Sequence, residues 1–170
     1  MIRIREEQPQ DRDAIREIHV RAFGQSQEAE IVDTLRRSCN DLLSLVALKE
    51  DSIVGHILFS PVTVEANERT VLGMGLAPMA VMPEFQKKGV GSELVRTGVE
   101  KLRNRGCPFV IVLGHPEYYP RFGFEVASRC GIRCEWDVPD DAFMILVLDT
   151  LRMRGVSGVA KYRPEFRDEA

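Results

Sequence analysis

The chain has 170 residues, of which 44% are hydrophobic and 29% charged, and its formal net charge is −3. These values are ordinary for a globular protein with one sizeable core, and the slight acidic excess argues against a general nucleic-acid-binding protein. No apolar run is long enough to span a bilayer, and no signal-peptide region follows Met1. We therefore expect a cytoplasmic protein that binds neither nucleic acid nor membranes.

The N-terminal half of the chain predicts a strand, two helices and then three strands. Ile2 and Ile4 alternate with arginines, as in a half-buried strand. Asp11 is a favourable helix cap, and Gly24 ends the apolar periodicity that follows it. The later runs are rich in β-branched residues, which favours antiparallel pairing. The predicted elements are a strand at 2–5, helices at 11–23 and 27–37, and strands at 43–48, 53–65 and 70–81.

The third of these strands contains Gly73, Gly75 and Pro78, which interrupt its pattern. Because proline cannot donate to a strand ladder, a bulge or a local splay is expected there. Beyond it, apolar periodicity predicts a helix at 92–103, and a continuous apolar run predicts a central strand at 109–113. A short helical turn at 117–121 and a final pair of strands at 132–136 and 143–148 follow.

We expect a single domain over residues 1–150, followed by a C-terminal extension over residues 151–170. The extension either packs on the domain as a strand, through Val156, Val159 and Tyr162, or frays.

The segment that joins the strand ending at Val81 to the helix beginning near Ser92 has the composition of a phosphate-binding loop. It reads Gln86-Lys87-Lys88-Gly89-Val90-Gly91. The first amides of a helix have no acceptor inside the helix, and the helix dipole adds positive charge there. The two glycines let an anion approach the backbone. The alternative is a helix start whose glycines serve close packing.

Two common nucleotide-binding motifs do not match this loop. A P-loop requires a Gly-Lys pair, which is missing here, and a dinucleotide fingerprint requires a third glycine after Gly91. These mismatches weaken a third interpretation, that of a nucleotide-binding α/β protein.

Two segments resemble the GNAT superfamily of N-acetyltransferases. The segment from Met79 to Gly91 resembles the family's central acetyl-CoA-binding motif, and Tyr118-Tyr119-Pro120-Arg121-Phe122-Gly123-Phe124 resembles its later aromatic signature. The match extends over roughly residues 2–148. The resemblance implies an α/β (α+β) fold with a mixed, mostly antiparallel central sheet, splayed in the middle and flanked by helices on both faces.

The resemblance also implies acetyl-CoA as co-substrate and no metal. The loop amides would hold the pyrophosphate with help from Ser92, and the backbone of the preceding strand would pair with the pantetheine arm. The two lysines either reach phosphates or remain solvated, and Tyr118 would line the CoA channel. The expected cofactor-binding residues are Met79, Ala80, Val81, Gln86, Lys87, Lys88, Gly89, Val90, Gly91, Ser92 and Tyr118.

Tyr119 occupies the tyrosine position of the aromatic signature. A phenol with a pKa of about 10 stays protonated at neutral pH and can donate to a departing thiolate. The alternative is a packed tyrosine whose hydroxyl bonds to the backbone. Pro120 stands where many relatives carry a charged residue, and it stiffens the turn that aims the phenol.

Several residues are candidates for the base that removes a proton from the acceptor amine, and a chain of water molecules is an alternative to a single base. His115 follows the central strand, and its intrinsic pKa suits a base; it equally suits a histidine that holds a turn. Glu28 faces the expected acceptor side and is the predicted substrate-binding residue, with Glu30 and Glu117 as further candidates. His19 and His56 lie on apolar-patterned segments and are interpreted as core or surface residues.

The four cysteines are scattered, and we interpret them as free thiols. Cys130 and Cys134 suggest a metal pair, but no second pair or nearby histidine completes a zinc set.

The sequence therefore favours an acetyl-CoA-dependent N-acetyltransferase that modifies an amine of a small molecule or peptide by direct attack in a ternary complex. The alternative is a non-catalytic acyl-CoA-binding sensor or regulatory module. A homodimer through the C-terminal strands is a further expectation.

Overall fold

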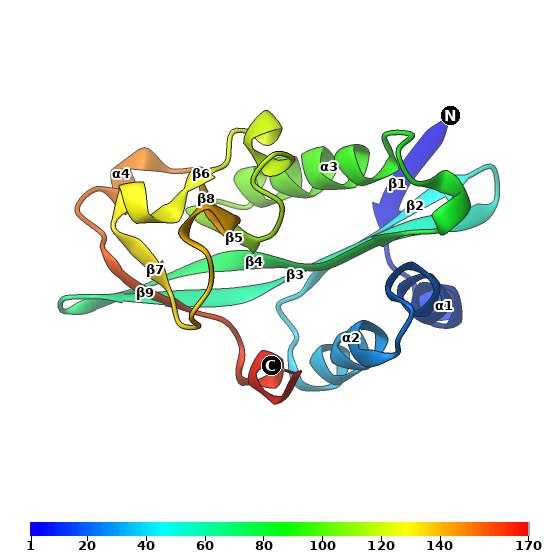
Figure 1. Ribbon diagram of the computed structural model, residues 1–170, viewed down its shortest axis with the longest axis horizontal. Helices are drawn as coiled ribbons and strands as arrows, with labels where there is room; N and C mark the ends of the chain where they lie inside the picture. Colours follow the sequence, from blue (N-terminus) through cyan, green and yellow to red (C-terminus); the bar gives the residue numbers. More distant parts are fainter. Residues whose placement is uncertain (170) are drawn as a thin grey trace. The chain divides into compact units, whose positions relative to one another are not determined.

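The computed structural model describes residues 1–169, with their side chains to Arg167 (Figure 1). The elements named below are β1 (Ile2–Glu6), α1 (Arg12–Phe23), α2 (Gln27–Ser38), β2 (Leu43–Lys49), β3 (Ser52–Ala66), β4 (Arg69–Val81), α3 (Val90–Asn104), β5 (Phe109–Leu113), β6 (Glu125–Val126), β7 (Ile132–Cys134), β8 (Phe143–Val147), α4 (Thr150–Met153) and β9 (Gly158–Lys161).

The strands form one mostly antiparallel sheet, as the sequence predicted. Hydrogen-bonded neighbours follow the order β1-β2-β3-β4-β5-β8-β6, with β9 beside β3 and β7 beside β9. The β4–β5 pair is parallel, and its ladder joins Met74–Leu76 to Val110–Val112, whereas β4 itself continues to Val81. The predicted mixed fold of the GNAT type is confirmed by this topology.

Packing divides the chain into two compact units. The first contains residues 1–59 and 77–98 together with the segment that begins at Pro164, and the second contains residues 60–76 and 99–163. The division predicted from the sequence, at residue 150, stays a prediction.

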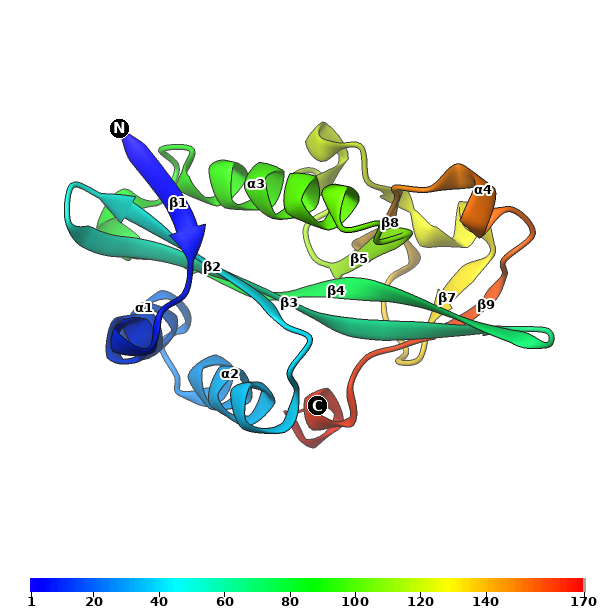
Figure 2. The ribbon, with the colours of Figure 1, turned by 180° about the vertical axis from the view of Figure 1, so that it is seen from behind.

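In the first unit, helices cover both faces of the strands. On one face, α1 and α2 pack against β2 and β3 (Figures 1 and 2). The buried side chains there are Ile15, Ile31, Val32, Leu35, Val46, Leu48 and Leu58, and Phe166 from the C-terminal segment packs against them. On the other face, α3 lies close to β3, because Gly98 leaves room for the ring of Phe59. Side chains of β3 thus alternate between α2 and α3.

In the second unit, glycines of β4 admit aromatic rings. A β-carbon at Gly73 would lie 2.6 Å from the ring of Phe109, and one at Gly75 would lie 2.8 Å from that of Tyr162. These glycines do not end β4, which runs on to Val81, but its ladder with β5 stops at Leu76, in agreement with the local splay expected near Pro78. Both glycines also serve the close packing of these rings.

Two expectations needed correction. The strands near 132–136 and 143–148 are not partners of each other, because β7 pairs with β9, and β8 pairs with β5 and β6. The helix after the glycine-rich loop begins at Val90 rather than at Ser92. Part of the C-terminal extension does pack as a strand, since β9 pairs with both β3 and β7. Within residues 1–169, no helix is long and apolar enough to cross a lipid bilayer.

Candidate active site

The predicted phosphate loop lies in the first unit, between β4 and α3 (Figure 1). Lys87 and Gly89 adopt left-handed backbone conformations, with φ of 63° and 89°, and turn the chain into the helix. The first helical bond runs from the Glu93 amide to the Gly89 carbonyl, at 3.1 Å. The amides of Val90 and Gly91 precede that bond, so they point out of the helix end, where the dipole favours an anion.

Three contacts hold this loop in place from within the same unit. The Gln86 side-chain amide donates to the Val81 carbonyl at 3.0 Å, which closes the loop on the end of β4. The Met82 amide donates to the Val54 carbonyl of β3 at 2.8 Å. Glu84 forms a 2.7 Å ion pair with Arg21 of α1. These contacts restrain the loop within its own unit, which lowers the entropic cost of ordering it on binding.

Positive charge gathers at the rim of the loop around one aromatic ring. The ammonium groups of Lys49 and Lys88 lie 5.5 and 5.9 Å from the centre of the Phe85 ring. These distances allow a cation–π contact. Lys49 belongs to the end of β2, and no sequence signal connects it to the loop.

The strand residues expected to pair with pantetheine form the last stretch of β4. Ala80 is buried, whereas Met79 and Val81 are half-buried. Their backbone belongs to a regular strand, so its N–H and C=O groups have the spacing that an extended amide chain requires. The role of the three residues stays a prediction.

Tyr119 lies in the second unit, in a short 3-10 helix after β5. It is 7% exposed, and its ring packs at 5.0 Å from that of Tyr118 and 5.7 Å from that of Phe124. Gly114 leaves room for the ring, since a β-carbon there would lie 2.6 Å from it. Burial, with a smaller contribution from Tyr118, raises the pKa of Tyr119 to about 12. The phenol therefore keeps its proton at physiological pH.

His115 is exposed and holds the turn before Tyr119. Its carbonyl accepts hydrogen bonds from the amides of Tyr118 and Tyr119, at 3.1 and 3.4 Å. Tyr118 is half-buried beneath the guanidinium of Arg121, which lies 4.5 Å from the ring centre. The second unit thus brings together three of the predicted residues, and the assignment of His115 as a base stays a prediction.

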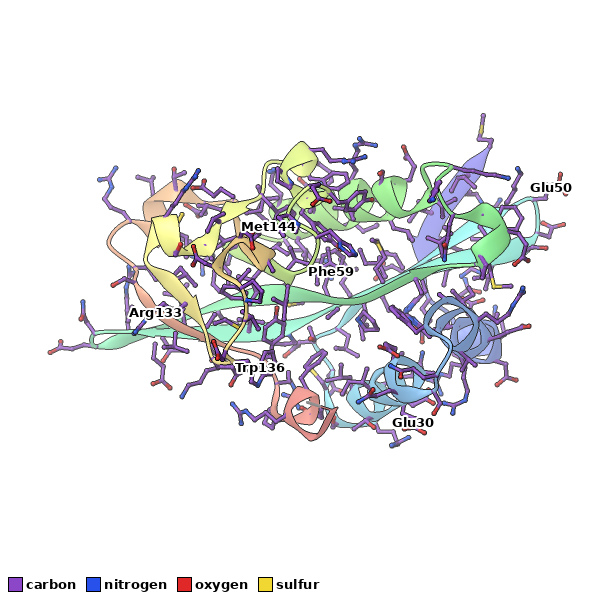
Figure 3. The ribbon with its side chains drawn as sticks, viewed as in Figure 1. Glu30, Glu50, Phe59, Arg133, Trp136 and Met144 are labelled. Carbon is purple, nitrogen blue, oxygen red and sulfur yellow. The ribbon has the colours of Figure 1, made fainter. Side chains whose placement is uncertain are left out.

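The acidic candidates are solvent-accessible. Glu28, in the first turn of α2, accepts hydrogen bonds of 3.2 and 3.3 Å from Gln25. Glu30 projects from the outer side of α2 (Figure 3) and accepts a bond from Ser26 at 3.3 Å. Glu117 is exposed. Glu28 is half-buried, and its predicted role stays a hypothesis, because a carboxylate in a first helical turn is also what helix electrostatics favours.

No metal centre is found among the described residues, because they contain no group of three or more suitable side chains. All four cysteines are free thiols.

A buried polar network in the first unit was missed by the sequence analysis. His19 of α1 and His56 of β3 are both 0% exposed and form a 2.8 Å hydrogen bond. His56 continues to Ser44, and Ser44 to Glu7. The apolar residues around each histidine in the sequence allowed a position in the core. The hydrogen bond between the two histidines could not be predicted in this way, because it depends on strand register and helix packing.

Comparison with known proteins assigns the family. The sequence profile described as "Acetyltransferase (GNAT) domain" matches residues 3–127. The uncharacterized N-acetyltransferase YjhQ of Escherichia coli (strain K12) is 46% identical over 134 residues, which cover 77% of this chain and 74% of YjhQ. The uncharacterized N-acetyltransferase YhbS of the same organism is 35% identical over 164 residues, covering 96% of this chain and 97% of YhbS.

Solved structures agree with the sequence relatives. The crystal structure of YhbS from Escherichia coli in complex with CoA has a TM-score of 0.90 and 33% identity, covering 98% of this chain and 92% of YhbS. A GNAT family acetyltransferase from Brucella melitensis in complex with acetyl-CoA has a TM-score of 0.77 and 32% identity, covering 98% of each chain. The fold, the loop and these relatives together define the class: the chain belongs to the GNAT acetyltransferase family. The sequence-based recognition of that family is confirmed.

Proposed function

We propose that this protein transfers the acetyl group of acetyl-CoA to an amine of a small molecule or peptide, by direct attack within a ternary complex. The observation that carries the proposal is the conformation of the loop from Gln86 to Ser92, whose helix-end amides are arranged for a pyrophosphate. The relatives support it, because one is solved with CoA and another with acetyl-CoA. They offer no support for a non-catalytic sensor.

The loop supplies binding, and Tyr119 supplies a proton. In this proposal the backbone from Met79 to Val81 aligns the pantetheine arm, which holds the thioester beside the amine. Attack by the amine expels the CoA thiolate. The Tyr119 phenol, protonated because its pKa is about 12, donates to that sulfur.

Binding of the acceptor is assigned to Glu28, whose carboxylate would attract an ammonium group. His115 is the side chain proposed to take the amine proton, either directly or through water. The free cysteines agree with a reducing, cytoplasmic location. Among residues 1–169, β7 pairs with β9 alone. The other edge of β7 is therefore available for pairing with a second copy of the chain, which supports a homodimer.

The first test is thermal unfolding with acetyl-CoA, with CoA and with ATP as the control. A ligand at a hundredfold excess over its dissociation constant stabilises the folded state by about 2.7 kcal/mol. We expect both CoA species to raise Tm and ATP to leave it unchanged. Absence of any shift with CoA species would remove the cofactor assignment.

The second test separates an enzyme from a sensor. Release of the CoA thiol is followed with a panel of alkylamines, arylamines and peptides with free N-termini. Acetylation of any of them supports the enzyme, whereas tight binding of acetyl-CoA without turnover for the whole panel would favour the sensor.

A further inference from the structure

Three side chains of the first unit form a cationic cluster beside the glycine-rich loop. Lys49 ends β2, whereas Phe85 and Lys88 belong to the segment before α3. The Phe85 ring is half-buried, and both lysines are exposed. Their ammonium groups lie 5.5 and 5.9 Å from the centre of that one ring, within the range of cation–π contacts. We call these three residues the Phe85 cluster.

A β-bulge lies where the β2–β3 hairpin meets the loop. The register of β2 against β3 shifts between Ala47 and Leu48, which leaves Val54 as an extra residue of β3. The carbonyl of Val54 accepts the Met82 amide at 2.8 Å, at the start of the loop. Lys49, at the end of the same hairpin, is therefore held beside the loop by backbone contacts as well as by the aromatic ring.

The two lysines of the cluster lack an acidic partner. Among the side chains that the structure describes, no carboxylate forms an ion pair with Lys49 or Lys88. Glu84 of the loop is paired with Arg21 of α1, at 2.7 Å. Glu50 lies at the outer end of the hairpin (Figure 3), with a left-handed φ of 58°. Two positive groups that converge on one ring repel each other, and an anion between them would offset that repulsion.

Acetyl-CoA carries a phosphate group that the helix-end amides do not account for. The amides of Val90 and Gly91 are assigned to the pyrophosphate, and the ribose attached to that pyrophosphate bears a separate 3′-phosphate. A phosphate monoester carries a charge of about −1.5 to −2 at pH 7. Lys88 precedes Val90 by two residues, so its flexible four-carbon stem can extend from the loop toward the ribose. Lysine binds phosphate as a point charge, without the strict geometry of a guanidinium.

We propose that the Phe85 cluster binds the ribose 3′-phosphate of CoA, so that the protein selects 3′-phosphorylated acyl donors. This proposal rests on the proposed function and deepens it, because it specifies the form of the donor. Lys49 and Lys88 contact the phosphate, and the Phe85 ring holds both side chains on the same side of the loop. The hairpin end thus becomes part of the cofactor site.

Exposure limits how strongly this subsite can bind. Water and salt weaken each contact between an exposed ammonium group and the phosphate. We therefore expect a preference for CoA over 3′-dephospho-CoA of about tenfold, to which each lysine contributes about threefold. The preference should shrink as ionic strength rises from about 0.01 M to about 1 M, because the Debye length falls from about 30 Å to about 3 Å.

The subsite is tested by isothermal titration calorimetry of the full-length protein with CoA and with 3′-dephospho-CoA, which lacks only that phosphate. We expect the wild type to show a Kd about tenfold lower for CoA. Lys49→Gln and Lys88→Gln should each raise the Kd of CoA about threefold and leave that of 3′-dephospho-CoA unchanged. The double variant should bind the two ligands equally.

Two further variants control for charge and for structure. Lys49→Arg keeps the charge, and its guanidinium also stacks on aromatic rings, so the preference should be retained. Lys161→Gln removes another exposed strand lysine, at the end of β9 in the second unit, and both Kd values should stay unchanged. A purely structural role of Lys49 would weaken both ligands by the same factor, whereas the subsite changes their ratio.

The remaining outcomes separate the subsite from the proposed function. Equal affinity of the wild type for the two ligands would overturn the subsite and leave the pyrophosphate loop and the proposed function intact. A preference for CoA that persists in the double variant would also overturn it, because another group would then hold the phosphate. Absence of binding of either ligand would instead overturn the cofactor assignment, and the proposed function with it.

Discussion

Tyr119 is a buried phenol that keeps its proton, and this combination makes its role testable at the scale of a single residue. Its ring contacts three aromatic neighbours, Tyr118, Phe122 and Phe124. Replacement by phenylalanine keeps those contacts and removes only the hydroxyl group.

We therefore expect Tyr119→Phe to lower kcat by roughly a hundredfold, the lower range of general acid catalysis, with little change in the Kd of acetyl-CoA. Steady-state kinetics and isothermal titration calorimetry measure the two quantities. The matched control is Tyr118→Phe in the same aromatic cluster, for which kcat should change far less. Equal rates for Tyr119→Phe and the wild type would remove the acid role of the phenol.

Gly89 tests the loop, because its left-handed backbone faces open space. Its φ is 89°, and apart from its two chain neighbours no atom of the described residues lies within 4 Å of a β-carbon placed there. Gly89→Ala should therefore fold with a loss of about 1–2 kcal/mol from the strained backbone. The added methyl group lies where phosphate approaches, and we expect the Kd of acetyl-CoA to rise at least tenfold, as measured by calorimetry.

Gly106 provides the matched control, since it has a φ of 81° and equally open surroundings at the other end of α3. Gly106→Ala should show the same loss of stability without the loss of affinity. If both variants bind acetyl-CoA as the wild type does, the loop does not hold the cofactor backbone in the proposed way.

At the scale of elements, the packing of α3 on β3 depends on one glycine. A β-carbon at Gly98 would lie 2.3 Å from the ring of Phe59, which is itself fully buried. Alanine favours a helix over glycine by up to about 1 kcal/mol, but overpacking of a core costs about 1–3 kcal/mol. The steric term is the larger of the two.

Gly98→Ala should therefore lower the free energy of unfolding by about 1–2 kcal/mol in urea titrations. Glu100→Ala, at an exposed position two residues away on the same helix, tests the propensity term and should be neutral or slightly stabilising. Adding Phe59→Leu to Gly98→Ala makes room for the methyl group, and we expect a coupling that recovers part of the loss. Simple additivity of the two losses would contradict this explanation.

At the scale of the whole molecule, the buried histidine pair makes stability depend on pH. The pKa of His19 is about 4 in the folded protein and about 6.5 in an unfolded chain. Between these values the unfolded chain binds more protons, so the stabilising contribution is complete above pH 6.5 and is lost as pH falls toward 4.

For His19 alone, we expect the free energy of unfolding to fall by roughly 2 kcal/mol between pH 7 and pH 5. His56 adds a change of the same sign, because its pKa is also lowered. Urea denaturation at a series of pH values measures the slope. A variant with His19→Gln should show a flatter dependence over this range; an unaltered slope would mean that His19 is not a neutral buried group.

Short contiguous segments account for what could be predicted from the sequence. The loop from Gln86 to Ser92 and the aromatic turn around Tyr119 are encoded by neighbouring residues, so glycine positions, helix signals and family resemblance identify them directly. The helices and most strands follow from local periodicity. The mostly antiparallel sheet and the family were therefore predicted correctly.

Only the tertiary structure decided which distant side chains meet. Glu7, His19, Ser44 and His56 come from four segments, and their hydrogen bonds depend on the β2–β3 register, in which Val46 lies opposite His56. Lys49 reaches Phe85 for a similar reason, and β7 pairs with β9 rather than with β8. Local sequence determines backbone conformation within a few residues. The partnerships of buried polar groups depend instead on packing, which ångström-scale changes in register and helix position decide.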